Sequence, residues 1–258
     1  MKLQMCTWLD VQNYLKQSQG IVIPMGSTEQ HGPSGLIGTD AITSEFIAAA
    51  MAENNQILIA PTLSLGPAAF NLNFPGTICL RPSTWINIVV DCVESLAHQG
   101  FRCFYFLNGH GGNIAPTLSA IQEVQRSRST SPLPLPPLMF RVKSWWEFPE
   151  VNDLRQAWYG DGEGMHATPS EISITKHLFP QMCPEDQLPP AKSLDKSFYQ
   201  THAGDQHLDA NSHRLQFPDG RVGSNSALSN PAHGKILLNT AAKAAVLDYL
   251  SLIEEHRA

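Results

Sequence analysis

Apolar residues follow two alternating patterns along this chain. Short continuous apolar runs bounded by turn residues predict buried strands, and longer amphipathic stretches between them predict helices. The predicted strands are Ile21–Pro24, Ile57–Ala60, Phe101–Leu107 and Leu138–Val142. The predicted helices are Ala41–Glu53, Ser83–Gln99, Asn113–Arg128, Ser170–Leu178 and roughly Pro231–Glu255, with Gly100 as a C-terminal stop. This alternation predicts an α/β fold with a mainly parallel sheet covered by helices on both faces.

Two segments interrupt the alternation. Pro132–Pro137 is typical of a stiff connector leading into a strand, and Asp195–Ser229, rich in His, Asn, Gly and Asp, predicts a long irregular loop of the kind that often covers an active site. The chain has no internal repeat or heptad pattern. Its 258 residues are 42% hydrophobic, enough for one sizeable core, so we expect a single domain over residues 1–258.

Charge and cysteine usage narrow the class of protein. The formal net charge is −6 and the basic residues are scattered, which argues against nucleic-acid binding and favours a small-molecule substrate. The five cysteines are well separated and never spaced as Cys-x-x-Cys, which argues against disulfides and thiolate zinc sites. The N-terminus lacks a signal-peptide pattern and no apolar run approaches the length of a membrane span. A soluble, cytoplasmic protein without membrane association is therefore expected.

The first motif that carries chemistry follows the first predicted strand. Glu29 and His31 lie in a Gly- and Pro-rich turn, two residues apart, so both side chains project the same way from an extended segment. Loops that leave the carboxyl ends of strands are where α/β proteins bind ligands. Asp40 stands at the start of the next helix, where it is either an ordinary N-cap or, together with Glu29 and His31, a bridging metal ligand. A hydrogen-bonded pair that stabilises the turn is the alternative for Glu29 and His31.

The second motif is Asn108–Asn113, a glycine-rich turn between a buried strand and a helix. It places His110 at the carboxyl end of a second strand. Glycine-rich turns also bind phosphates, but this one lacks the Lys and Ser/Thr of a Walker loop and the spacing of a dinucleotide fingerprint. A nucleotide-binding module therefore remains a weaker alternative, testable by whether a phosphate ligand raises the melting temperature without metal.

The third motif is His166–Glu171, at the start of another predicted helix. Thr168 or Ser170 is placed to cap that helix, and Glu171 falls in its first turn. A glutamate there is commonly just a favourable partner for the helix dipole, and taken alone this interpretation is the stronger one.

The candidate metal ligands in these three motifs are three carboxylates and two imidazoles. This mixture suits Zn²⁺ or Mn²⁺, with Fe²⁺ also possible, and does not suit an all-oxygen calcium site. Two divalent ions against three carboxylates leave one positive charge, which a bridging hydroxide would neutralise; such a hydroxide forms near neutral pH and can attack a carbonyl. The candidate metal ligands are Glu29, His31, Asp40, His110 and Glu171.

These motifs resemble the creatininase (creatinine amidohydrolase) family. The resemblance is carried by Glu29–Pro33 with Thr39–Asp40, by Asn73–Thr77, by Asn108–Asn113, and by His166–Ala167 with Glu171; Gly223–Gly234 is a weaker echo. It implies a three-layer α/β/α sandwich, a binuclear metal centre, and hydrolysis of a non-peptide, cyclic or terminal amide C–N bond. It also implies a homo-oligomer, commonly a homohexamer.

The resemblance also implies roles for individual residues. Glu29 and His110 would hold one metal, His31 and a further carboxylate the other, and Asp40 would bridge the two. Creatininase has that further carboxylate where this chain has Gly112, so we assign the role to Glu171 and expect that creatinine is not the substrate.

His166 matches the proton-transfer histidine of the family and is expected to act as general acid toward the leaving nitrogen; its alternative is a hydrogen-bond donor behind a metal ligand. Expected substrate contacts are Trp145, Trp146, Ser34, Gly111 and Gly112, although paired tryptophans are as often plain core or interface residues. Two other functions remain open for this fold. One is a metal-stabilised binding or assembly protein without catalysis, and the other is a small-peptide peptidase of the mycofactocin-processing type.

Overall fold

Three parallel strands form the sheet of this computed structural model, which describes residues 1–184, 194–202 and 209–257. The strands are β1 (Gly20–Met25), β2 (Cys103–Asn108) and β3 (Met139–Ser144), in the order β1-β2-β3. Every residue of β1 and β2 is buried, because helices cover both faces of the sheet. That burial explains why these strands are continuous apolar runs in the sequence.

The predicted strand Ile57–Ala60 is wrong as a full strand. Ile59 forms only isolated parallel bridges, to Val22 and to Lys2, on the far side of β1. Pro61 follows Ala60 directly and has no N–H with which to extend the ladder.

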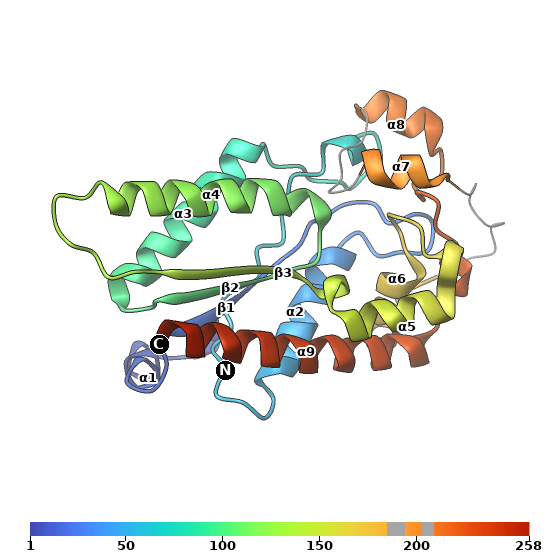
Figure 1. The fold of residues 1–258 in the computed structure, drawn as a ribbon. Coiled ribbons are helices and arrows are strands. Elements are labelled where there is room, and N and C mark those ends of the chain that lie inside the picture. Colours follow the sequence, from blue (N-terminus) through green and yellow to red (C-terminus); the bar gives the residue numbers. More distant parts are fainter. Residues whose placement is uncertain (185–193, 203–208, 258) are drawn as a thin grey trace.

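The helices form one layer on each side of the sheet, which gives the expected α/β/α arrangement (Figure 1). On one side α3 (Pro82–Gln99) packs against α4 (Ile114–Ser129). On the other side, α2 (Thr39–Ala52) and α6 (Pro169–Leu178) pack along α9 (Pro231–Arg257), which also contacts α5 (Pro149–Tyr159). As predicted, Gly100 ends α3 in a left-handed conformation, with φ 115°.

The sheet divides the core into two apolar clusters. Ile21 and Phe104 point toward α3 and α4, whereas Val22 and Tyr105 point toward α2 and α9, as the two-residue period of a strand requires. Helices cover both faces of the sheet, so the loops that carry the polar motifs lie at the end of the sheet where the strands finish at their carboxyl ends.

The sequence analysis missed several helices. They include α1 (Trp8–Leu15) and α5, and also α7 (Lys196–Thr201) and α8 (Ala210–Gln216), which lie inside the segment predicted to be irregular. Residues 203–208 of that segment lie outside the described residues. Short 3-10 turns occur at η1 (Leu3–Met5), η2 (Ala69–Asn71), η3 (Gly111–Asn113), η4 (Trp145–Glu147), η5 (Gly160–Gly162) and η6 (Ser226–Leu228).

Helix α9 is the one helix in the described part of the chain that is long and apolar enough to cross a membrane, judged by length and composition alone. Core helices of globular proteins meet the same criterion. In α9 the buried residues, among them Leu237, Ala241 and Tyr249, form the face that packs in the core beneath the sheet. Packing in the core thus accounts for its apolar composition.

Candidate metal centre

The polar motifs come together where β1 and β2 end. Met25 and Asn108, the last residues of these strands, are partners in the parallel register, so the loops that follow them emerge side by side. The first loop carries Glu29 and His31, and the second carries His110. This is the edge at which open α/β sheets bind ligands.

Two glycines allow the first turn of α2 to approach both strand ends. A Cβ on Gly26 would lie 2.3 Å from the backbone nitrogen of Ala41, and a Cβ on Gly109 would lie 2.2 Å from the carbonyl oxygen of Asp40. No larger residue fits either position without moving the backbone. The glycines therefore set how closely Asp40 approaches the two loops.

Asp40 lies between two histidines. Its Oδ1 is 2.8 Å from His31 Nε2, and its Oδ2 is 3.1 Å from His110 Nδ1. The N-cap position of α2 is occupied by Gly38, so the N-cap interpretation of Asp40 is wrong. Its carboxylate faces the two loops instead of capping the helix.

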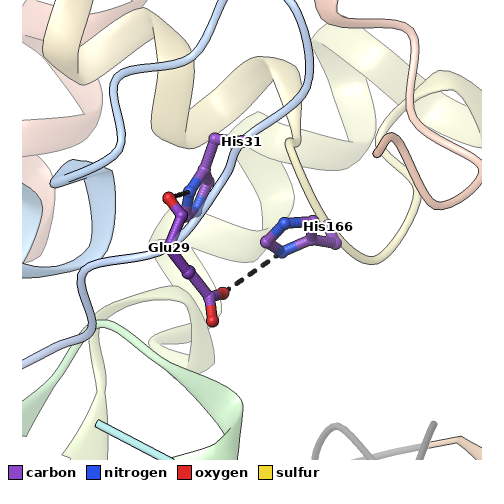
Figure 2. A group of neighbouring side chains, drawn as sticks. All are labelled: Glu29, His31 and His166. Carbon is purple, nitrogen blue, oxygen red and sulfur yellow. Dashed lines mark hydrogen bonds and ion pairs between the residues drawn. The ribbon is translucent and has the colours of Figure 1, made fainter. Parts of the chain in front are cut away.

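Glu29 completes the contacts around His110. Its Oε1 lies 3.3 Å from His110 Nδ1 and 3.6 Å from His166 Nδ1. Figure 2 shows Glu29 directed toward His166, with the ring of His31 close to the backbone of Glu29. Although Glu29 and Asp40 are buried, Glu29 Oε1 and Asp40 Oδ2 accept no hydrogen bond from the described residues.

All three histidines are oriented by backbone carbonyls. His31 Nδ1 lies 3.1 Å from the carbonyl oxygen of Glu29, His110 Nε2 lies 2.7 Å from that of Pro67, and His166 Nε2 lies 2.7 Å from that of Gln30. A carbonyl only accepts, so each of these nitrogens carries the proton. In a neutral ring the other nitrogen then points its lone pair toward a carboxylate. The two repel each other unless a proton or a cation lies between them.

The electrostatics of the cluster agree with that requirement. Burial disfavours the charged form of His31, but the carboxylates of Asp40 and Glu171 outweigh burial and raise its pKa to about 10. Burial also disfavours the charged form of Asp40, but His31 and His110 lower its pKa to about 2. For Glu171 burial dominates and raises the pKa to about 7. Without a metal, His31 therefore holds a proton that a cation bound there would displace.

Glu171 has two contacts at once. Its Oε1 accepts the backbone N–H of Thr168 at 2.5 Å, and the Thr168 hydroxyl accepts the backbone N–H of Glu171 at 3.3 Å, which together form a capping box. Thr168 is thus the N-cap of α6, one of the two expected candidates. The other oxygen, Glu171 Oε2, lies 3.9 Å from His31 Nε2. Glu171 can therefore cap α6 through one carboxylate oxygen and act as a metal ligand through the other.

Among the described residues, three groups of side chains have ligand atoms within 4.8 Å of one another. They are Glu29, Asp40 and His110; His31, Asp40 and Glu171; and Glu29, His31 and His166. The first two share Asp40 and contain all five candidate metal ligands. Their mixture of carboxylate oxygens and imidazole nitrogens fits Zn²⁺ or Mn²⁺.

A cavity of about 320 Å³ opens beside this cluster. Asp40, His110, His166 and Glu171 line it, and so do Trp145, Trp146 and Gly111 among the expected substrate contacts. Ser34 is fully buried and does not line it, and neither does Gly112. The roles of these five residues in substrate binding stay predictions.

Gly112 has a packing role that the sequence analysis did not foresee. A Cβ at this position would lie 2.4 Å from the carbonyl oxygen of Pro67 and 2.6 Å from His110 Nε2. These are the two atoms of the hydrogen bond that orients His110. A carboxylate at residue 112 would thus displace the histidine, which is why the backbone here accepts only glycine.

Other supporting residues were also missed. Gln30 Nε2 donates to Asn71 Oδ1 at 2.7 Å and to the carbonyl of Gly220 at 2.9 Å. Val222 pairs with His166 in an antiparallel bridge, and Ser224 Oγ donates to the His166 carbonyl at 2.7 Å. Gln30 lies between the candidate ligands Glu29 and His31, and this position in the sequence could have indicated that it supports the site. The contacts of residues 220–224 had no local signal, but they agree with the expectation that this long segment lies against the site.

Comparison with known proteins was made by sequence and by structure. The sequence model of a family described as creatininase, creatinine amidohydrolase, matches residues 4–247. A 3-dehydro-scyllo-inosose hydrolase of Thermotoga maritima is 31% identical over 109 residues, 42% of this chain and 35% of that protein. A mycofactocin precursor peptide peptidase of Mycobacterium tuberculosis is 35% identical over 114 residues, 40% of this chain and 45% of the peptidase. The matched stretches span less than half the length of these two relatives.

Among solved structures, a creatininase with manganese superposes with a TM-score of 0.79. The superposition covers 98% of each chain at 19% sequence identity. Similarity at this identity shows that the fold is shared and leaves the chemistry to be argued from the site.

Proposed function

This chain belongs to the creatininase family, and from that premise we propose that it is a metal-dependent amidohydrolase that cleaves a non-peptide, cyclic or terminal amide C–N bond of a small molecule. The observation that carries the proposal is the shared position of Asp40 between the two ligand groups, with Glu29 and His110 on one side and His31 and Glu171 on the other.

The residues fit two divalent cations, which we propose to be Zn²⁺ or Mn²⁺. His31 Nε2 and His110 Nδ1 face buried carboxylates, and two carboxylate oxygens accept no hydrogen bond from the described residues. Bound cations would complete these contacts, and would polarise a carbonyl and lower the pKa of water from about 16 toward 7. Glu171 serves in this proposal as the carboxylate that position 112 does not supply.

The protein side of the mechanism centres on His166. Its Nε2–H is held by the carbonyl of Gln30, so Nδ1, 3.6 Å from Glu29 Oε1, is the atom that faces the site. We infer that Nδ1 first takes up the proton released by the attacking water and then delivers it to the departing nitrogen. Trp145 and Trp146 line the same cavity and would exclude water from the substrate.

Two alternatives are weighed against this function. A peptidase is favoured by the name of the Mycobacterium relative. However, the cavity, at about 320 Å³, lies at the small end of ligand pockets, which span roughly 300–1,000 Å³, so we favour a small amide. A binding or assembly protein is the other alternative, and the orientation of His166 toward the site argues against it. Creatinine is not our expected substrate. The homohexamer is a proposal that rests on the family, and the cytoplasmic location is a proposal that rests on the separated cysteines.

The test is metal content together with turnover. Protein purified without chelators should contain two divalent metals per chain, and Glu171→Gln should lower that number toward one. Glutamine at the third position of a helix still completes a capping box, so α6 should stay intact. Glu147→Gln is the matched control, because Glu147 lines the same cavity and also completes a capping box, but is in none of the ligand groups.

The wild-type protein should then hydrolyse at least one member of a panel of cyclic amides and formamides, with no turnover after chelation. A protein without bound metal, or with the same metal content in Glu171→Gln as in wild type, contradicts the assignment of Glu171. Cleavage of a short peptide in preference to every small amide would favour the peptidase alternative.

A further inference from the structure

Arg155 is a cation in the cavity wall that the proposed hydrolysis does not use. It projects from α5 and is the one lysine or arginine among the described residues that line the cavity. Its side chain is only 14% exposed, so it does not extend into solvent as surface arginines do. A charged group that is largely shielded from solvent in this way must be stabilised by the groups that it binds.

Three contacts hold the guanidinium in place. Arg155 Nε donates to Glu163 Oε1 at 2.8 Å, and Nη1 donates to the carbonyl of Trp146 at 3.4 Å. Its Cζ also lies 6.0 Å from the centre of the Trp145 ring. These contacts use Nε and one N–H of Nη1, and Nη2 has no hydrogen bond to any described residue.

Glu163 connects this cation to the candidate metal centre. Its Oε1 accepts hydrogen bonds from both Arg155 Nε and the hydroxyl of Ser170. Ser170 directly precedes Glu171, and both residues line the cavity. The first turn of α6 therefore carries a metal-ligand candidate and, through Glu163, fixes the position of Arg155 in the same wall.

We propose that Arg155 recognises a carboxylate on the substrate, so that the substrate is a small amide that carries one carboxylic acid group. The inference rests on the proposed function and specifies its substrate class. Nη2 and the second N–H of Nη1 remain available, and two such parallel N–H groups match the two oxygens of a carboxylate.

A single negative charge fits the cavity better than two. Glu163 already neutralises part of the charge of Arg155, and Glu147 is a carboxylate in the same lining. Glu147 is itself held away in a capping box, where its Oε2 accepts the backbone N–H of Ser144 at 2.9 Å. A dianionic phosphate would need more positive charge than this wall provides.

The test uses two cyclic amides that differ in one group. L-Pyroglutamate carries a carboxylate, and L-pyroglutamamide carries a neutral carboxamide of the same shape. Isothermal titration of the manganese-loaded protein should show that pyroglutamate binds about tenfold more tightly, the size expected for a charge-assisted hydrogen bond. This measurement depends only on binding, and the protein does not need to turn over either compound.

Arg155→Met should remove the preference, leaving the two dissociation constants within about threefold of each other. Arg155→Lys keeps the charge and the contact with Glu163 but loses the fork, and should weaken the preference without removing it. If Arg155→Met does not fold, Arg155→Lys serves as the test: a weaker preference for pyroglutamate supports the proposal, and an unchanged preference overturns it. The control is Arg126→Met, which removes an exposed arginine twelve residues beyond Ile114 on α4, about 18 Å along the helix from the cavity.

Equal affinity for the two compounds in wild type, or no binding of pyroglutamate, overturns the proposal. A preference that survives in both Arg155 variants also overturns it, because the metals would then hold the carboxylate. The proposed function fails separately, if a protein with two metals hydrolyses no amide. In that case a preference that depends on Arg155 would still support carboxylate recognition.

Discussion

His166 donates its Nε2–H to the backbone carbonyl of Gln30 across 2.7 Å, although the two residues are 136 positions apart in the chain. Gln30 stands between two candidate ligands, so the loop that carries them also fixes which nitrogen of His166 faces the site. Asn71 Nδ2 lies 3.4 Å from the same Nε2, but it can only donate and does not compete for that proton. The tautomer of His166 is therefore set by the main chain of the metal-binding loop.

Replacing His166 should separate catalysis from metal binding. We expect His166→Ala to lower turnover by about 10²- to 10⁴-fold, the usual contribution of a general acid, while two metals per chain remain. Turnover of an amide identified by screening, measured beside metal analysis of the same preparations, checks this. His98→Ala is the control, because His98 is exposed in the last turn of α3. A loss of metal would instead make His166 a ligand, as its place in the third ligand group allows.

Adding a methyl group at Gly112 should damage both stability and the metal site. The new Cβ would meet the Pro67 carbonyl and the His110 ring, so Gly112→Ala should reduce the free energy of unfolding by about 1–3 kcal/mol. The displaced His110 should also lower the metal content. Chemical denaturation and elemental analysis measure the two effects.

Gly38→Ala is the comparison for Gly112→Ala, since its added Cβ would meet only Ile42, at an ordinary 3.4 Å. Equal effects of the two substitutions, or full metal retention in Gly112→Ala, would contradict the packing argument.

His213 should make the fold sensitive to acid. Burial lowers its pKa to about 4, an effect that the nearby Glu29 carboxylate only partly opposes. Its ring packs against Phe70 and Phe217, with centroids 4.8 and 5.1 Å away. Below about pH 6.5 the unfolded chain gains a proton on this residue, whereas the folded chain does not until about pH 4. The contribution of neutral His213 to the free energy of unfolding is therefore fully present above about pH 6.5, and it is lost as the pH falls toward about 4.

The measurement is the denaturation midpoint from pH 7 to 4 for wild type and His213→Phe. The variant should lose less stability than wild type over this range. Because both proteins keep the same metal ligands, the difference between the two curves isolates His213. Parallel curves would show that His213 takes up its proton equally easily in the folded and the unfolded chain.

Local patterns of residues were enough to predict the alternation of strands and helices and to identify the candidate ligands. Strands such as β1 and β2 are continuous apolar runs. Helices such as α3 have apolar residues at helical spacing and a glycine at the C-terminal end, so local patterns specify both kinds of element. Glu29, His31 and His110 were also recognisable locally, because they stand in glycine-rich turns that follow strands, where α/β proteins bind ligands. The resemblance to a family added their pairing and their roles.

The contacts that support the site come instead from segments that are far apart in the sequence. Whether Gly112 is free for a side chain depends on Pro67, and whether Arg155 faces the cavity depends on Glu163 and Trp146. The bridge between His166 and Val222 likewise joins segments that are distant in sequence. Such contacts form because the packing of helices on the sheet fixes the separation between loops. That separation is a property of the whole core, and no local pattern of residues encodes it.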